Sequence, residues 1–300
     1  PVNKRGSGGG GIKTRSVFRD AVPRWRFAYF ADMGKVGRPA GRNHLLPARR
    51  RNTPIHKNLL LSIMVNAMEY RLGVLGGMGP QATNTFYQFV IDRTDARSDQ
   101  EHVNALILSD SGMPDRTGAI LGTAEQRRAV FDRLLGDARL LENAGCTVIA
   151  VPCNTSHFFL DEVQKHISIP ILHMIRETAL YLAAQGKRRP GILATDGTIQ
   201  TGLYQKEFAA QGIEAVTPSP EAQKLVMSLI YDDVKAGRDG DPAKFAAIHR
   251  DLAAQGCDCG VLACTELSVF ADKHHLPPFY TDAMAVLAER AVQACHKPLR

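Results

Sequence analysis

Two short segments of this 300-residue chain repeat one pattern 111 residues apart: an apolar run, then a cysteine, then polar residues. The first segment is 148–155 and the second is 260–266. The apolar run in each is typical of a parallel strand that is buried on both faces. Parallel sheets bind ligands at the carboxyl ends of their strands, so we expect Cys153 and Cys264 to lie beside a ligand.

A longer motif is duplicated in the same order and at a similar spacing. Its first copy runs from 73–75 through Thr83 to Tyr87-Gln88, and its second from 191–193 through Thr201 to Tyr204-Gln205. Duplicated motifs in one order predict two related half-domains. A site at their junction could present one thiol to each face of a small molecule.

Strand and helix patterns alternate from residue 71 onward, which predicts parallel sheets covered by helices. The expected strands are 72–75, 103–108, 147–151, 170–172, 191–194, 213–216 and 260–263, and one of the expected helices is 224–236. The predicted fold class is α/β, with two similar, pseudo-duplicated parallel-sheet domains and the active site in the cleft between them. We place the first domain at 68–172 and the second at 173–281. The C-terminal helix at 282–300 is a candidate to join the first domain.

The formal net charge of +7 comes from the N-terminal part of the chain. Residues 1–60 hold 14 Lys or Arg against two acidic residues, which leaves 23 basic and 28 acidic side chains in 61–300. Residues 1–63 have no helical or strand periodicity, and we predict a disordered basic extension. Its possible origins are a targeting peptide, an interaction arm, appended sequence, or translation from a site upstream of Met64.

Charge and apolar patterning also bear on partners and location. Nucleic-acid binding would depend entirely on the basic extension, so we expect none from the folded part. Neither do we expect a membrane partner, because no apolar run approaches the roughly 18–20 residues of a membrane span. The six cysteines lie in apolar or helical contexts, which is typical of reduced thiols and predicts a cytoplasmic protein.

Most single cysteines are inert core residues, and we interpret Cys146, Cys257, Cys259 and Cys295 in this way. Cys153 and Cys264 differ because each precedes the expected start of a helix. Exposed backbone N–H groups and the helix dipole at such a start would lower a thiol pKa from about 8.5. One thiolate and one thiol on opposite faces could remove an α-proton and return one to the other side.

Polar residues beside the two sulfurs suit a carboxylate. Asn154, Thr155 and Thr265 could donate hydrogen bonds to a carboxylate that gains charge during proton removal. The alternative is that these three residues only cap helices, for which Asn and Thr are well suited.

Two cofactor hypotheses are disfavoured. Cys257, Cys259 and Cys264 supply three thiols, whereas a structural zinc site usually has four ligands. The glycine-rich loop 76–83 matches a short dinucleotide fingerprint, but no acidic residue follows at the usual spacing and Pro80 removes one N–H donor. We interpret this loop as a small-anion cradle or a tight turn, with Met78 and Gly79 near the ligand, and we expect no cofactor and no metal.

With both cysteine motifs, the loop 76–83 and the segment 194–198 in view, the chain resembles the aspartate/glutamate racemase superfamily, and most closely its aspartate racemase branch. The resemblance covers about residues 71–296. It implies a cofactor-independent racemase in which Cys153 and Cys264 are the two acid/base residues. It also implies that Asn154, Thr155 and Thr265 lie near the substrate carboxylate, and that the enzyme is a homodimer.

The resemblance also bears on the substrate. Glu266 stands where glutamate racemases typically have a histidine, which indicates aspartate, with glutamate as a possible second substrate. Arg116 and Lys235 match residues that engage substrate carboxylates in aspartate-type relatives. Without the resemblance, Arg116 would be interpreted as a solvated loop residue and Lys235 as an exposed helix-end lysine.

Two alternatives remain open at this point. Paired cysteines on such a scaffold also resemble those of hydantoin racemases and maleate isomerases. A protein that only binds an acidic amino acid is the other alternative, and its binding would survive replacement of both Cys153 and Cys264 by serine.

Overall fold

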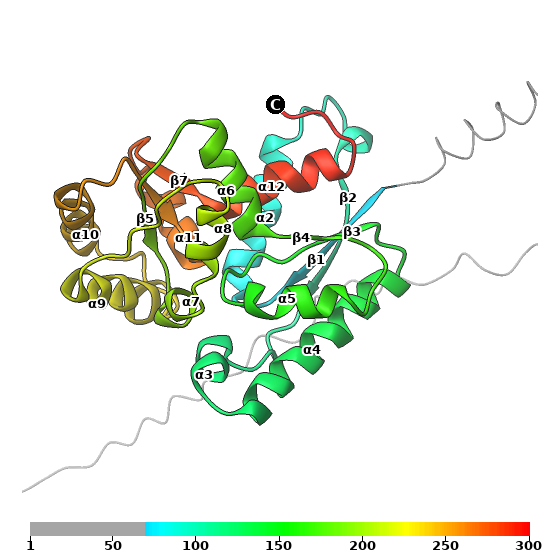
Figure 1. Ribbon diagram of the computed structural model, residues 1–300. Coiled ribbons are helices and arrows are strands. Elements are labelled where there is room, and N and C mark those ends of the chain that lie inside the picture. Colours follow the sequence, from blue (N-terminus) through cyan, green and yellow to red (C-terminus); the bar gives the residue numbers. More distant parts are fainter. Residues whose placement is uncertain (1–69) are drawn as a thin grey trace, which may run out of the picture. The chain divides into compact units, whose positions relative to one another are not determined.

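The computed structural model describes residues 70–300, so the predicted basic extension at 1–63 lies outside the described residues. The first half contains a four-stranded parallel sheet in the order β2-β1-β3-β4 (Figure 1). Its elements are β1 (Arg71–Gly76), α2 (Pro80–Arg93), a 3-10 turn η1 (Asp99–Glu101), β2 (Asn104–Ser109), α3 (Arg116–Leu121), α4 (Ala124–Asn143), β3 (Val148–Ala150), α5 (His157–Gln164) and β4 (Ile171–Leu172).

The second half contains a three-stranded parallel sheet in the order β5-β6-β7. Its elements are α6 (Met174–Ala184), β5 (Pro190–Leu193), α7 (Asp196–Gln200), α8 (Leu203–Ala209), α9 (Pro220–Ser228), a π-helical turn η2 (Leu229–Val234), α10 (Pro242–Ala254), β6 (Cys259–Leu262), α11 (Thr265–His274), β7 (Tyr280–Asp282) and α12 (Ala283–Ala294). The α/β class with two parallel sheets is confirmed.

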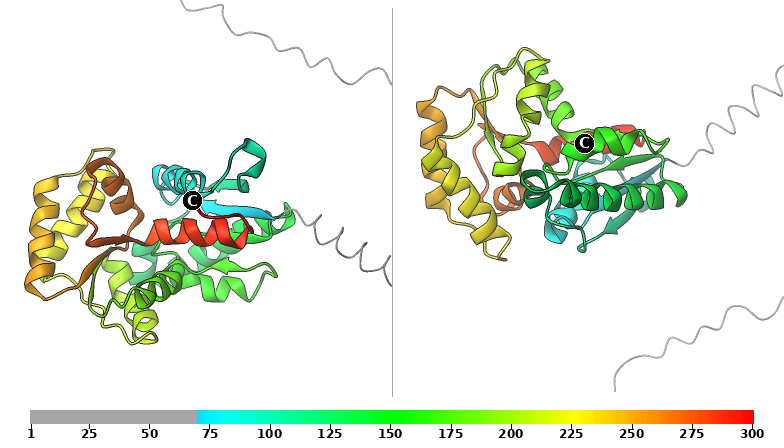
Figure 2. Two further views of the ribbon diagram at one scale, coloured as in Figure 1. Left: turned by 90° about the horizontal axis from the view of Figure 1, so that it is seen from above. Right: turned by 60° about the horizontal axis from the view of Figure 1, so that its bottom comes forward.

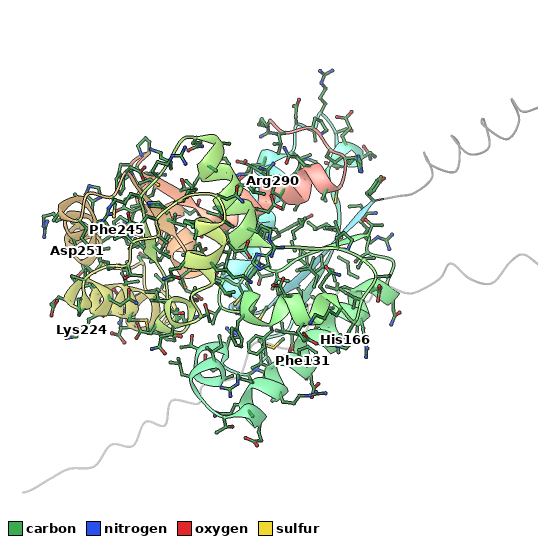
Figure 3. The ribbon with its side chains drawn as sticks, in the orientation of Figure 1. Phe131, His166, Lys224, Phe245, Asp251 and Arg290 are labelled. Carbon is green, nitrogen blue, oxygen red and sulfur yellow. The ribbon has the colours of Figure 1, made fainter. Side chains whose placement is uncertain are left out.

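Strands β1, β3, β5 and β6 are buried on both faces, which explains why they read as continuous apolar runs. In the first sheet, Leu72 and Val74 pack toward α2, α6 and α12, whereas Leu75 and Ile149 pack toward α4 and α5. The second sheet has a comparable outer core, formed with α9, α10 and α11. In that core the ring of Phe245, labelled in Figure 3, lies 5.1 Å from the ring of Phe270.

The C-terminal helix α12 connects the two halves. It runs from the second sheet to the side of the first, where it packs against α2 and α6 (Figure 2). Leu287 and Val292 are fully buried in a core cluster that also contains residues of both sheets. Beyond α12 the backbone pairs with the end of α2, where the N–H of Arg300 donates to the carbonyl of Arg93. Among residues 70–300, no helix has the length and apolar content to span a bilayer.

Two of the expected elements differ in the structure. The strand predicted at 213–216 is reduced to one parallel bridge: Val216 lies opposite Gly191, its N–H donates to Pro190 and its carbonyl accepts from Ile192, and the chain then turns toward α9 at Pro220. The single helix expected at 224–236 is instead α9 followed by the π-helical turn η2. Strand β7 was not predicted, because three residues next to a helix carry too little periodicity to be detected.

Candidate active site

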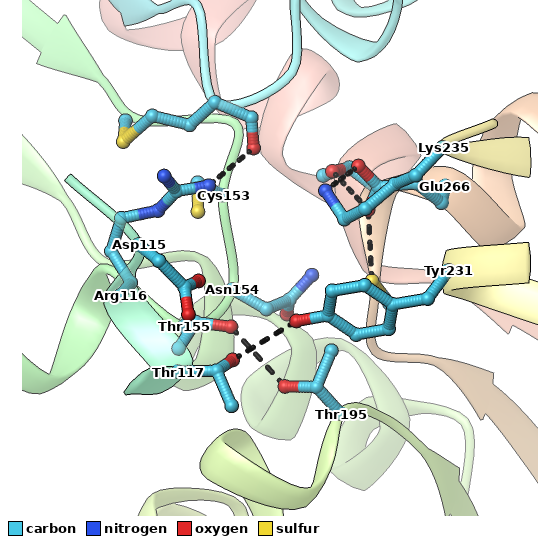
Figure 4. A pocket seen from close by; sticks show the side chains of 13 residues that line it. Asp115, Arg116, Thr117, Cys153, Asn154, Thr155, Thr195, Tyr231, Lys235 and Glu266 are labelled. Carbon is cyan, nitrogen blue, oxygen red and sulfur yellow. Dashed lines mark hydrogen bonds and ion pairs between the residues drawn. The ribbon is translucent and has the colours of Figure 1, made fainter. Parts of the chain in front are cut away.

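Residues that follow β3 and β6 line one narrow pocket, which has a cavity volume of about 30 Å³ and is partly open to solvent (Figure 4). Cys153 and Asn154 lie on one side of this pocket, opposite Lys235 and Glu266. The pocket therefore takes its walls from both halves. It is lined by Met78, Asp115, Arg116, Thr117, Cys153, Asn154, Thr155, Thr195, Tyr231, Lys235, Cys264, Thr265 and Glu266.

A carboxylate on the second half contacts both a thiol and an ammonium group. The Sγ of Cys264 donates to Oε2 of Glu266 at 2.9 Å, and Nζ of Lys235 forms an ion pair with Oε1 of the same carboxylate. Burial and the charge of Glu266 raise the pKa of Cys264 well above its usual value. Burial lowers the pKa of Lys235, but Glu266 and Cys264 together outweigh that effect and raise it.

The expected lowering of the thiol pKa is therefore wrong for Cys264. Cys264 does occupy the N-cap position of α11, as the sequence predicted. However, its burial and its contact with Glu266 outweigh the helix dipole, which contributes only modestly at a helix end.

Cys153 does not lie directly at a helix start. A turn at 154–156 separates it from α5, which begins at His157. The carbonyl of Cys153 accepts a hydrogen bond from Nδ1 of His157 at 2.9 Å, and Nε2 of His157 accepts from the N–H of Met174 at 3.0 Å. Burial lowers the pKa of His157 to about 3, so the ring is neutral and Nδ1 carries the proton.

Asn154 and Thr155 contact the second half rather than capping α5. Oδ1 of Asn154 accepts from the hydroxyl of Tyr204 at 2.5 Å, and Nδ2 of Asn154 is buried with no partner. Oγ1 of Thr155 lies 2.9 Å from Oγ1 of Thr198. The unpartnered amide N–H group of Asn154 is thus available to an acceptor in the pocket.

The guanidinium of Arg116 lines the pocket but already holds backbone carbonyls. Its NH1 donates to Pro114 at 3.0 Å, and its NH2 donates to Met78 at 3.1 Å. Its Nε is buried without a partner. Arg116 therefore orders the loop around Met78, and its Nε remains an unused buried donor.

The glycine-rich loop is a tight turn whose shape depends on Gly77. Gly77 has a φ of +88°, and a Cβ there would lie 2.3 Å from the backbone of Asp110. Its N–H donates to Oγ1 of Thr83 at 2.8 Å, so this donor is not free to bind an anion. Met78 lines the pocket, whereas Gly79 lines a neighbouring cavity together with Lys235 and Glu266.

Every residue expected near the substrate except Gly79 lines the pocket that contains both cysteines. Four further lining residues were not singled out: Asp115, Thr117, Thr195 and Tyr231. Asp115 and Thr117 flank Arg116, so the same motif could have indicated them. Tyr231 precedes Lys235 by four residues, and helical spacing places both on one face.

The remaining cysteines pack into apolar cores. Cys257 and Cys259 belong to different core clusters: Cys257 lies in the turn before β6, whereas Cys259 is the first residue of that strand. Burial raises the pKa of Cys259 to about 12. Within residues 70–300, no group of three or more His, Cys, Asp or Glu side chains is arranged to hold a metal ion.

Sequence and structure comparisons identify relatives of this chain. The family described as Asp/Glu/Hydantoin racemase matches residues 75–291. The broad specificity amino-acid racemase RacX of Bacillus subtilis (strain 168) is 28% identical over 225 residues, which are 74% of this chain and 96% of the relative.

Two solved structures share the fold. The aspartate racemase of Picrophilus torridus has a TM-score of 0.66 and 28% identity, and the match covers 77% of this chain and 96% of that one. An aspartate racemase homologue from Pyrococcus horikoshii OT3 has a TM-score of 0.63 and 22% identity, with coverage of 76% and 99%. The family match extends over most of the described residues and includes both cysteine segments. This chain therefore belongs to the Asp/Glu/hydantoin racemase family.

Proposed function

We propose that this protein interconverts the L and D forms of an acidic amino acid, aspartate first, with Cys153 and Cys264 as the two acid/base groups. The observation that carries the proposal is one pocket lined by both cysteines, which follow matched strands of the two sheets. Family membership supports a racemase-type isomerase.

The proposed reaction moves one proton in each of two steps. The thiolate of Cys153 takes the α-proton from one face and becomes a thiol, which leaves a carbanion whose charge spreads onto the substrate carboxylate. The thiol of Cys264 then gives its proton to the opposite face and becomes a thiolate. Burial and the contact with Glu266 raise the pKa of Cys264, which suits the acid role in this direction, and the reverse reaction exchanges the two roles.

Unused donors in the pocket support a carboxylate substrate. The buried Nδ2 of Asn154 and the buried Nε of Arg116 have no partners among the described residues. A carboxylate in the pocket would satisfy Nδ2 of Asn154, and it would gain negative charge as the α-proton leaves. Lys235 adds a cation to the opposite wall of the pocket.

A second candidate is a racemase of broad substrate range. Lys235 is already paired with Glu266, and Arg116 is held by backbone carbonyls, so neither side chain needs a second substrate carboxylate to hold its position. The relative RacX is named as a broad specificity racemase. Neutral amino acids therefore belong in the substrate panel.

The decisive experiment incubates the purified protein with L-aspartate in deuterated water under reducing conditions, without added metal or pyridoxal phosphate. NMR follows α-proton exchange and chiral chromatography follows D-aspartate. We expect both signals in the wild type, and we expect neither Cys153→Ala nor Cys264→Ala to form D-aspartate. A matched control, Cys295→Ala, removes a core thiol outside the pocket and should retain turnover.

Other outcomes assign the function differently. Turnover of neutral amino acids at rates similar to aspartate would favour the broad-range candidate. Turnover of a hydantoin or of maleate, with no turnover of amino acids, would contradict the proposal. It would indicate a different reaction on the same fold. Binding of aspartate that survives in the Cys153→Ser, Cys264→Ser double variant, without turnover in the wild type, would indicate a binding protein.

A further inference from the structure

Tyr204 is a buried tyrosine whose hydroxyl reaches the pocket wall from the second half. It lies on α8, is 1% exposed, and its ring packs edge-on against Phe208 at 5.4 Å. Its hydroxyl donates to Oδ1 of Asn154 on the first half. Tyr204 itself does not line the pocket, so its influence on a ligand would act through Asn154.

The orientation of the Asn154 amide follows from this hydrogen bond. Oδ1 faces the tyrosine, so Nδ2 must point the other way, toward the middle of the pocket in Figure 4. With the opposite orientation, Oδ1 would face the pocket and would repel a carboxylate. Burial raises the pKa of Tyr204 well above its usual value, so its hydroxyl stays protonated and continues to donate.

We propose that Tyr204 is a positioning residue that orients the Asn154 amide so that its N–H groups bind the substrate carboxylate. The inference rests on the proposed function for its substrate class, and it adds a residue that lies behind the pocket wall. The contact crosses from α8 to the loop after β3. The Asn154 amide is therefore correctly oriented only when the two halves pack against each other as in this structure.

Removal of the hydroxyl tests the proposal. Tyr204→Phe keeps the ring in its core but leaves Oδ1 of Asn154 without a donor. The amide can then rotate so that Oδ1 and Nδ2 exchange places. Loss of this buried hydrogen bond should lower kcat/KM for L-aspartate by about 10- to 100-fold. The loss should appear mainly as a higher KM. The dissociation constant of succinate, an unreactive dicarboxylate, should rise by a similar factor in calorimetry.

A double-mutant cycle separates positioning from packing. If Tyr204 acts through Asn154, then Tyr204→Phe in an Asn154→Ala background should change kcat/KM and succinate affinity by less than about twofold. Asn154→Asp keeps an acceptor for Tyr204 and lacks the N–H group, so it should lose at least as much as Tyr204→Phe. This variant tests the same contact if Tyr204→Phe does not fold.

The matched control is Tyr280→Phe, because the hydroxyl of Tyr280 lies 2.9 Å from Nδ1 of His249 and is not part of the pocket. This variant should leave KM unchanged. Unchanged KM and succinate affinity in Tyr204→Phe, or fully additive losses in the cycle, would overturn the proposal. Absence of wild-type turnover with any amino acid would instead reject the proposed function, while the succinate measurement would still decide the role of Tyr204.

Discussion

Protonation of Cys264 depends on its immediate neighbours. The thiol donates to Glu266, and the same carboxylate holds the ammonium of Lys235. A nearby negative charge disfavours a thiolate, whereas a nearby positive charge favours one. Burial, the charge of Glu266 and the opposing charge of Lys235 together therefore set the pH at which this sulfur loses its proton.

Substitution of Glu266 by Gln should lower the pKa of Cys264. Glutamine retains an acceptor for the thiol but removes the charge that raises the pKa. The measurement is the pH dependence of iodoacetamide alkylation at Cys264 in a Cys153→Ser background, followed by peptide mass spectrometry. We expect half-maximal alkylation at a lower pH than in the parent chain.

The matched control for this titration is Glu221→Gln, which removes an exposed carboxylate from the first turn of α9, outside the pocket. It should leave the alkylation profile of Cys264 unchanged. An unchanged or higher midpoint in Glu266→Gln would show that Glu266 does not control the thiol.

Connections between strands and helices place the pocket walls at the scale of single elements. The turn from β1 to α2 places Met78 in the pocket. In the same turn, the backbone of Gly77 lies against the backbone of Asp110, which follows β2. The loop after β3 is tied through His157 to the N-terminus of α6. The first connection depends on a close backbone approach and the second on two buried hydrogen bonds, so side-chain substitutions at Gly77 or His157 should disturb them.

Substitution of Gly77 by Ala should destabilise the protein by more than about 2 kcal/mol, because a Cβ would overlap the Asp110 backbone in addition to the cost of a positive φ. Gly186→Ala is the matched control, since Gly186 also has a positive φ of +71° but open space around its Cβ position. Its cost should be about 1 kcal/mol. Equal losses in urea unfolding would contradict the proposed overlap.

His157 should make the protein less stable in acid. The unfolded chain binds a proton at His157 near pH 6.5, whereas the folded chain binds one only near pH 3. The stabilisation is therefore complete above pH 6.5 and is lost as the pH falls toward 3. Between pH 7 and pH 5 this amounts to about 2 kcal/mol.

The measurement for His157 compares urea unfolding of the wild type and His157→Gln at both pH values. The wild type should lose about 2 kcal/mol more than the variant over this interval. A parallel loss in the two proteins would mean that His157 does not contribute to the acid dependence.

One core cluster holds the two halves together at the scale of the whole described region. It contains side chains of β1 and β3 from the first sheet, β5 and β6 from the second, and the buried face of α12. A shared core of this kind couples the halves during unfolding. The homodimer remains a prediction, and sedimentation equilibrium would test it.

Leu287→Ala on α12 should destabilise both halves together. The side chain is fully buried in the shared core, and its truncation should cost about 2–5 kcal/mol. We expect one transition at a lower urea concentration, with far-ultraviolet and near-ultraviolet circular dichroism coinciding. Two separated transitions in the variant would show that the halves unfold independently.

Local patterns in the sequence determined the α/β class, the positions of most strands along the chain and the placement of both cysteines after strand ends. These features depend on residues close together in the chain, such as the apolar run at 148–151 and the residues that follow it. The resemblance of the motifs to a racemase family supplied the remaining expected site residues. The short strand β7 carried too few residues for such a signal.

Only the tertiary structure decided how distant residues act on one another. The contact of Tyr204 with Asn154 spans 50 positions, and that of Lys235 with Glu266 spans 31. The raised pKa of Cys264 follows from burial and a facing carboxylate, which outweigh the helix start visible in the sequence. Burial, charge pairing and amide orientation depend on which segments meet in space, and local sequence periodicity does not determine this.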